Sequence, residues 1–177
     1  MGAARYRFRP MTRADLPLVQ RWLETPHVAE WWGDPEEQIA RVTEELAEPA
    51  MEQFIVTAAE RPFGYVQSFE LATWPDPAFG AQPDGTRAVD QFIGEADMID
   101  RGHGSAFLRV FIEGLIAAGA PRVITDPDPA NVRAIRAYEK AGFRATEVVD
   151  TRSGPALLMV LTPMVDLSTN DPPTNDL

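Results

Sequence analysis

Proline and glycine punctuate this chain so closely that every helix or strand it forms must be short. The 177 residues include 16 Pro and 12 Gly. Between these breakers the apolar residues recur either at helical spacing or in alternation. They predict the order strand, two helices, three strands, helix, strand, helix, two strands. This order predicts an α/β (α+β) domain around one central sheet.

The expected helices are bounded by recognisable caps and stops. The first follows Thr12 or Asp15 and ends before Pro26, and the second begins at Asp34-Pro35 and continues to about residue 48. Glycines at their C-terminal ends delimit two later helices, at 102–118 and about 129–141.

The expected strands alternate with turns and one long loop. Five Pro and Gly residues exclude regular structure from 74–85. The strand at 89–98 contains Gly94, which we expect to form a bulge. Residues 1–165 are expected to form a single domain, and 166–177 a flexible, polar tail. The other expected strands are 6–10, 53–58, 63–69, 122–125, 143–150 and 156–161.

Composition excludes several classes of protein. With no Cys and two His, the chain has no thiolate nucleophile and few imidazoles to bind a metal, so we expect no metal cofactor. A formal charge of −11 repels nucleic acid and favours a cationic partner, although acidity can also serve solubility alone. No apolar run approaches the roughly 18 residues of a membrane span, and the first residues lack the apolar core of a signal peptide. We therefore expect a cytoplasmic protein that binds neither nucleic acid nor membrane.

Two segments carry candidate chemistry. In Asp97–Ser105, glycines 102 and 104 would let backbone N–H groups approach a pyrophosphate at a helix N-terminus, although an ordinary loop-to-helix turn explains these glycines equally well. In Asn131–Phe143, helical periodicity places Asn131, Ala134 and Tyr138 on one face. Tyr138 would then be a phenol beside a ligand, or a half-buried tyrosine with a satisfied hydroxyl.

Together these segments resemble the GNAT superfamily of N-acetyltransferases. The helix pattern N-x-x-A-x-x-x-Y-E-K-x-G-F matches at every fixed position, whereas the phosphate-loop pattern Q/R-x-x-G-x-G/A departs at Ile99. The segments 30–33, 64–68, 89–91 and 125–131 are similar to those of aminoglycoside 6'-N-acetyltransferases. The resemblance implies a single domain with a central mixed, mostly antiparallel sheet flanked by helices.

The resemblance also implies acetyl-CoA as co-substrate and direct transfer of its acetyl group to an amine. Backbone amides near Met98 would polarise the thioester oxygen. The implied cofactor-binding residues are Met98, Arg101, Gly102, His103, Gly104, Ser105, Asn131 and Ala134.

The implied catalytic residues are Asp90 as general base and Tyr138 as the acid for the departing thiolate. An ammonium of pKa about 10.4 costs roughly 4–5 kcal/mol to deprotonate at pH 7, so a carboxylate is required. Asp90 would need a raised pKa, a relay through water, or a role in holding the ammonium; a solvated aspartate at a strand edge is the alternative.

Four further residues are implied for acceptor binding. Asp126 would bind a second ammonium, although Asp-Pro is also a common turn start. Trp32 and Tyr65 would stack against a sugar, although such aromatic residues are more often core. Gln91 completes the set, and His27 is assigned no role.

The implied reaction is acetylation of a cationic small-molecule amine, most specifically the 6'-amine of an aminoglycoside. Two alternatives remain: acyl transfer to a hydroxylamine, peptide or siderophore precursor, and a non-catalytic acyl-CoA-binding module. The loop at 71–86 would discriminate between acceptors, because an acidic cleft suits a polycation. We expect a monomer or homodimer.

Overall fold

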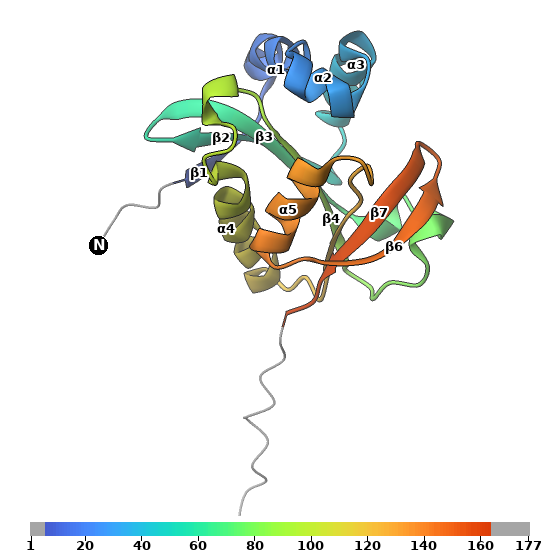
Figure 1. Cartoon of the computed structure of the whole chain (residues 1–177). Helices are drawn as coiled ribbons and strands as arrows, with labels where there is room; N and C mark the ends of the chain where they lie inside the picture. Colours follow the sequence, from blue (N-terminus) through green and yellow to red (C-terminus); the bar gives the residue numbers. More distant parts are fainter. Residues whose placement is uncertain (1–5, 164–177) are drawn as a thin grey trace, which may run out of the picture.

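The computed structural model describes residues 6–163, which form one mixed seven-stranded sheet with five α-helices (Figure 1). The strands are β1 (Tyr6–Pro10), β2 (Met51–Ala58), β3 (Arg61–Glu70), β4 (Arg87–Ile93), β5 (Val123–Thr125), β6 (Arg144–Thr151) and β7 (Gly154–Leu161). Their spatial order is β1-β2-β3-β4-β5-β7-β6, antiparallel throughout except for the parallel pair β4 and β5. The predicted fold class is therefore confirmed. The tail expected at 166–177 lies outside the described residues.

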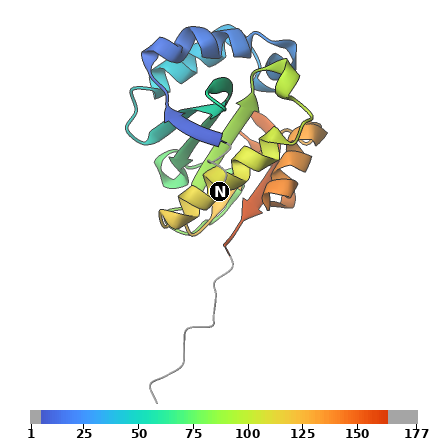
Figure 2. The same cartoon turned by 90° about the vertical axis from the view of Figure 1, so that its left-hand side faces the viewer.

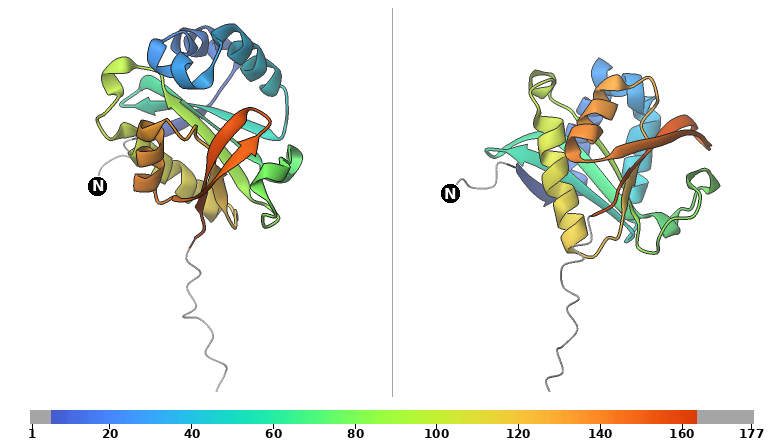
Figure 3. Two further views of the ribbon diagram at one scale, coloured as in Figure 1. Left: turned by 45° about the vertical axis from the view of Figure 1, so that its right-hand side comes forward. Right: turned by 60° about the horizontal axis from the view of Figure 1, so that its bottom comes forward.

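Helices cover both faces of the sheet. They are α1 (Leu16–Leu23), α2 (Pro26–Trp32), α3 (Pro35–Glu45), α4 (His103–Ala117) and α5 (Val132–Ala141). Helices α1, α2 and α3 lie together at one end of the molecule, while α4 crosses the sheet (Figure 2). The right-hand view of Figure 3 shows α4 and α5 side by side. Within residues 6–163, no helix is long and apolar enough to cross a bilayer.

The two-residue period of the strands divides the core between these faces. On β2 and β3, Ile55 and Tyr65 point toward α1–α3, whereas their neighbours Val56 and Val66 point toward α4 and α5. The same alternation on β4 places Phe92 on the α1–α3 face. Successive residues of one strand therefore pack into the core on opposite faces of the sheet.

The N-terminal helical region differs from the sequence prediction by one additional helix. Pro26 ends α1 as expected, but it also occupies the first position of α2, because Thr25 adopts the extended conformation of an N-cap. Seven residues are too few to show a clear helical period. Helix α3 begins as predicted, with the Asp34 side chain accepting hydrogen bonds from the N–H groups of Glu36 and Glu37.

The strand expected at 89–98 ends at Ile93. The predicted bulge at Gly94 is present: the N–H groups of Gly94 and Glu95 both donate to the Phe63 carbonyl, at 2.8 and 3.2 Å. Residues 96–98 then form a 3₁₀ turn rather than strand. Side-chain space explains why glycine occupies the bulge, because a Cβ at Gly94 would lie 2.1–2.4 Å from indole atoms of Trp22.

We predict that Gly94→Ala destabilises the protein by about 3 kcal/mol or more, because the Trp22 indole cannot move without opening the core. Thermal unfolding should show a fall in Tm of about 10 °C. Gly114→Ala is the control, since a Cβ there has no heavy atom within 4 Å in the described structure and alanine favours the helix. Equal Tm values for the two variants would contradict the prediction.

Candidate functional site

The sheet opens between its two parallel strands. Strands β4 and β5 pair at only two positions within the described residues, Arg87 with Val123 and Ala88 with Ile124. Beyond Ala88, β4 continues alongside β3, whereas β5 ends at Thr125. The residues after β5 stay beside β7, where the Pro127 carbonyl accepts from Leu157 N–H at 2.8 Å. The second half of β4 therefore presents backbone hydrogen-bonding groups to a gap in the sheet.

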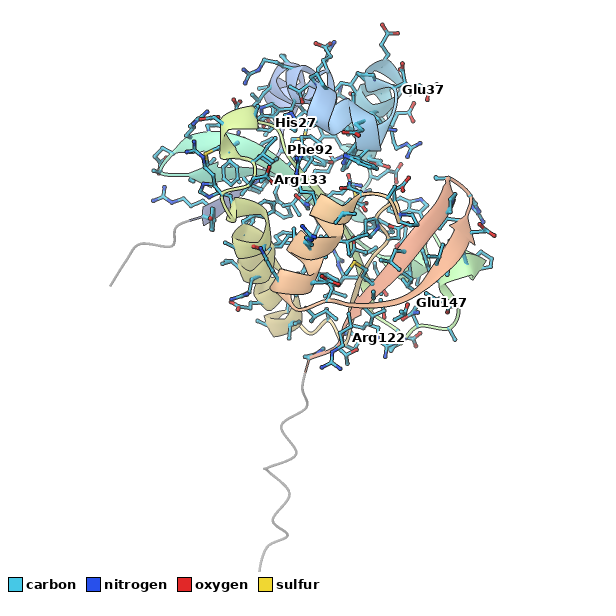
Figure 4. The ribbon with its side chains drawn as sticks, viewed as in Figure 1. His27, Glu37, Phe92, Arg122, Arg133 and Glu147 are labelled. Carbon is cyan, nitrogen blue, oxygen red and sulfur yellow. The ribbon has the colours of Figure 1, made fainter. Side chains whose placement is uncertain are left out.

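A cavity of about 110 Å³ lies beside this gap, between α2, the end of β4, the start of α4, and α5. Figure 4 labels three of its lining residues, His27 from α2, Phe92 from β4 and Arg133 from α5. Gly104 lets α4 pack close to β4 and α5. A Cβ there would be 3.6 Å from the Ile93 side chain and 3.9 Å from the Ala137 Cβ. The remaining lining residues are Val28, Trp31, Trp32, Gln91, Ile93, Ile99, Asn131, Ala134 and Ala137.

The loop before α4 has the backbone geometry of an anion site. Asp100 and Gly102 take positive φ values of 57° and 77°, and Gly102 is the N-cap of α4. The helical hydrogen bonds begin with Ala106 N–H donating to the Gly102 carbonyl, so the amides of Gly104 and Ser105 precede the ladder. A 15-residue helix adds the positive end of its dipole. The residues present thus fit a pyrophosphate.

The side chains of this loop divide between solvent and core. Arg101 is exposed, and Arg133 pairs with Asp100 at 3.2 Å. Ser105 Oγ donates to the Gly102 carbonyl at 3.3 Å. Met98 is buried, and the His103 ring is buried against Phe63 with its Nδ1 2.8 Å from the Tyr6 hydroxyl. Any contact of Met98 or His103 with a ligand is therefore made by backbone.

Asn131 and Ala134 lie where α5 meets both this cavity and a larger one. Asn131 is the N-cap of α5, not part of the helical face predicted from the sequence, and its Oδ1 accepts from Ala134 N–H at 3.1 Å. The difference arises because Pro129 and Ala130 form a turn before the helix instead of its first residues.

The larger cavity, of about 770 Å³, adjoins the smaller one and is lined by residues of both β4 and β5. Among the described residues, six carboxylates and two arginines line it: Glu30, Glu45, Asp76, Asp90, Asp126, Asp128, Arg41 and Arg152. Aromatic walls come from Trp31, Trp32, Phe69, Trp74, Phe79 and Tyr138. Part of the loop at 71–86 contributes to its rim, and Asp76 Oδ2 accepts from the Arg152 backbone N–H at 3.4 Å. The cavity is thus acidic, with flat apolar surfaces.

Asp90 lies on the floor of this larger cavity, on β4. Its Oδ2 accepts a hydrogen bond from Gln67 Nε2 at 3.0 Å. Burial raises the pKa of Asp90, while the Gln67 hydrogen bond and the charge of Arg41 partly offset that rise. A carboxylate with a raised pKa is a better proton acceptor near neutral pH than an ordinary aspartate.

Two other carboxylates share this field. Burial, together with the charges of Asp90 and Asp76, raises the pKa of Asp126 to about 7. Burial also raises the pKa of Glu45 to about 7, against the opposing charge of Arg41. Carboxylates crowded in this way are stabilised by a cation, which would replace the water they have lost.

Tyr138 is buried between the two cavities, on the face opposite Asp90, and lines the larger one. Burial is the main cause of the raised pKa of its phenol, and the charge of Asp90 adds to it. The side chains of Thr125 and Gln91 hydrogen-bond the same phenol and act in the opposite direction. The phenol therefore remains protonated and can donate.

The same architecture and sequence pattern occur in known proteins. Residues 11–151 match the model of the acetyltransferase (GNAT) domain family. This chain belongs to the GNAT acetyltransferase family. The match spans all the elements that form the two cavities, from α1 to β6.

This GNAT protein is similar to an aminoglycoside N(6')-acetyltransferase type 1 of Klebsiella pneumoniae, with 36% identity over 163 residues that cover 87% of this chain and 81% of the relative. A solved structure of AAC(6')-Ib with paromomycin and acetyl-CoA superposes with a TM-score of 0.81 and 35% identity, covering 90% of this chain and 94% of that one. A structure of the same enzyme with coenzyme A and kanamycin gives a TM-score of 0.79 at 35% identity, covering 89% and 94%.

Tyr65 departs from its predicted role in this GNAT fold. We expected it to stack against a sugar, but its side chain is fully buried, with its ring stacked on Phe92 at 5.2 Å. Tyr65 lies on the same face of β3 as Gln67, which lines the larger cavity, but residues of α1–α3 pack over Tyr65 and keep it from the cavity surface. Trp32 is half-buried and lines both cavities, as does Gln91.

Several residues of the site were not identified from the sequence. His27 received no role, yet its Nε2 lies 2.9 Å from the Ile93 carbonyl and it lines the smaller cavity. Arg41 and Glu45 line the larger one from α3. Their spacing of four residues places them on one helical face, which could have indicated a shared role. The position of α3 over β4 was not predictable from that spacing.

The raised pKa of Asp126 predicts a pH-dependent gain in stability for Asp126→Asn. Because the folded-state pKa is about 7 and the unfolded one about 3.9, the folded chain binds the extra proton between these values, and stability falls as pH rises toward 7. Asparagine carries no such cost. Thermal unfolding should show a Tm gain over the unsubstituted protein of about 2–4 °C at about pH 8 and little gain at about pH 4.5.

The control for this prediction is Glu147→Gln on exposed β6, which makes the same charge change outside the cavities (Figure 4). A gain for Asp126→Asn that is equal at both pH values, or matched by Glu147→Gln, would contradict the assignment.

Proposed function

We propose that this GNAT protein transfers the acetyl group of acetyl-CoA to a primary amine of an aminoglycoside, at the 6' position. The observation that carries this proposal is the meeting of two unlike cavities at Gln91, Asn131 and Ala134. One offers a helix N-terminus and a sheet gap suited to a pyrophosphate-bearing donor. The other is acidic and aromatic. The similarity to aminoglycoside 6'-N-acetyltransferases supports the same acceptor.

The residues proposed for the donor act mainly through backbone. The first-turn amides of α4, with Gly102, Gly104 and Ser105, would hold the pyrophosphate, and exposed Arg101 would add charge. The free edge of β4 would orient the chain that carries the thioester. When bound, acetyl-CoA supplies the activated acetyl carbonyl. Ala134 leaves room beside it, and Asn131 fixes the start of α5.

The acceptor amine would be held and deprotonated by Asp90, directly or through water. The amine nitrogen forms a bond to the acetyl carbon while the carbon–sulfur bond breaks. The proton leaves the amine for Asp90, and Tyr138 gives a proton to the departing sulfur. Both roles agree with the electrostatics, since burial raises the pKa of Asp90 toward that of a useful base and keeps the Tyr138 phenol protonated.

The six carboxylates favour a polycation over the other acceptors considered. An aminoglycoside places several ammonium groups on rigid rings, which suits separated carboxylates such as Asp126 and Asp128 and flat walls such as Trp32. A hydroxylamine or single amine would leave most of these charges without a counterion. A non-catalytic acyl-CoA-binding module would require neither Asp90 nor Tyr138.

Turnover measured by thiol release from acetyl-CoA tests the proposal. With kanamycin or tobramycin as acceptor, we expect Asp90→Asn to lower kcat/KM by about 10²–10³-fold and Tyr138→Phe by about 10–10²-fold. Glu147→Gln should match the unsubstituted protein. Acetyl-CoA binding without turnover of either aminoglycoside would overturn the proposed acceptor, and NMR of the product would show which amine is acetylated.

The acidic cavity also predicts a strong dependence on salt. Raising NaCl from about 0.1 M to about 1 M shortens the Debye length from about 10 to about 3 Å. The KM for tobramycin should therefore rise several-fold. The KM for an acceptor with a single amine and no other charged group should change far less. Equal salt dependence for the two acceptors would show that the carboxylates do not bind the polycation.

A further inference from the structure

A series of hydrogen-bonded, buried polar side chains runs beneath the larger cavity and ends on Asp90. Tyr65 and Gln67 are two residues apart on β3 and share one face, and Gln67 lies directly opposite Asp90 on β4. The Tyr65 hydroxyl donates to Gln67 Oε1 at 2.7 Å, and Gln67 Nε2 donates to Asp90 Oδ2 at 3.0 Å. Tyr65 is fully buried and Gln67 is 7% exposed.

We propose that Tyr65 is a positioning residue that acts through Gln67, locking the amide so that its N–H, and not its oxygen, faces Asp90. The inference rests on the proposed function, in which Asp90 receives the acceptor's proton. It assigns to Tyr65 a role in the reaction without contact with either substrate.

The direction of these two hydrogen bonds follows from which groups can donate. A glutamine amide is nearly symmetric in shape, so packing alone does not choose which end meets Asp90. A phenol whose proton points at Gln67 selects the oxygen for its own side. The amide of Gln53 is held from the other side, since its Nε2 donates to the Val42 carbonyl at 3.2 Å. The Tyr65 hydroxyl, 2.7 Å from Gln67 Oε1, therefore directs its proton at Gln67.

Without the hydroxyl, Gln67 Oε1 would lose its hydrogen-bond donor, and the Asp90 carboxylate alone would orient the amide. A turned amide would place an oxygen against the Asp90 carboxylate, and a mobile amide would weaken the bond to it. Either change removes stabilisation of the ionised form and moves the pKa of Asp90 upward. The ring stays, because phenylalanine retains the stacking on Phe92.

The other charged and titratable groups around Asp90 come from different elements and keep their places in this experiment. Arg41 and Glu45 approach from α3, Asp126 from the position directly after β5, and Tyr138 from α5. A shift caused by Tyr65 is therefore separable from theirs by substitution at Tyr65 and Gln67 alone.

The test follows the Asp90 carboxyl carbon by NMR titration of the full chain, with its signal assigned from Asp90→Asn. Tyr65→Phe should raise the Asp90 pKa by about half a unit to one unit, and Gln67→Leu by at least as much. The double variant should titrate like Gln67→Leu alone, because Tyr65 acts only through Gln67. The acid limb of kcat/KM for kanamycin should move to higher pH by the same amount.

Tyr6→Phe is the matched control, since it also removes a buried phenol hydroxyl, the one that contacts His103, but on the opposite face of the sheet. It should leave the Asp90 titration unchanged whatever its effect on Tm. An unchanged Asp90 pKa in Tyr65→Phe, or shifts that add in the double variant, would overturn the inference. The titration needs no turnover, so failure of the proposed acceptor would be seen separately, in the unsubstituted protein's lack of thiol release.

Discussion

The functional architecture depends on one interrupted contact, the pairing of β4 with β5. A continuous sheet satisfies its backbone groups between neighbouring strands and leaves none for a ligand. Here the pairing stops after two positions because β5 is three residues long and the chain after it follows β7 instead of β4. Both cavities adjoin the resulting gap and share Gln91 of β4 as a lining residue. A longer β5 would close that gap.

The N-terminal helices are attached to the end of β4 by a few specific contacts. Trp22 packs directly over Gly94, and its Nε1 donates to Glu95 Oε1 at 2.8 Å, where Arg21 also pairs with the same carboxylate at 2.9 Å. Only short connections separate α1, α2 and α3, so these contacts also position Trp32 and Glu45 at the larger cavity. The bulge at Gly94 thus serves packing and site geometry together.

The larger cavity brings together carboxylates that repel one another, and this repulsion lowers the stability of the folded protein. Asp126 and Glu45 each have a pKa of about 7, which means that the folded protein holds them ionised only with difficulty at neutral pH. Such sites commonly trade stability for activity. In the proposed function, the interaction with a polycationic acceptor would offset this repulsion, so binding and the destabilisation of the cavity would have the same physical origin.

Local sequence determined much of this protein: the breakers set the order of elements, Asp34-Pro35 set the start of α3, Gly94 marked the bulge, and the helix pattern through Tyr138 and Gly142 indicated the family. The tertiary structure alone decided which of these residues meet. Tyr65 shares a face of β3 with Gln67, yet α1–α3 cover Tyr65 and leave Gln67 on the cavity wall. Helix α3 also brings Glu45 to Asp90 across 45 positions of sequence. Local periodicity specifies the face of an element on which a side chain lies, but burial and pKa depend on the element packed against that face, which only long-range packing determines.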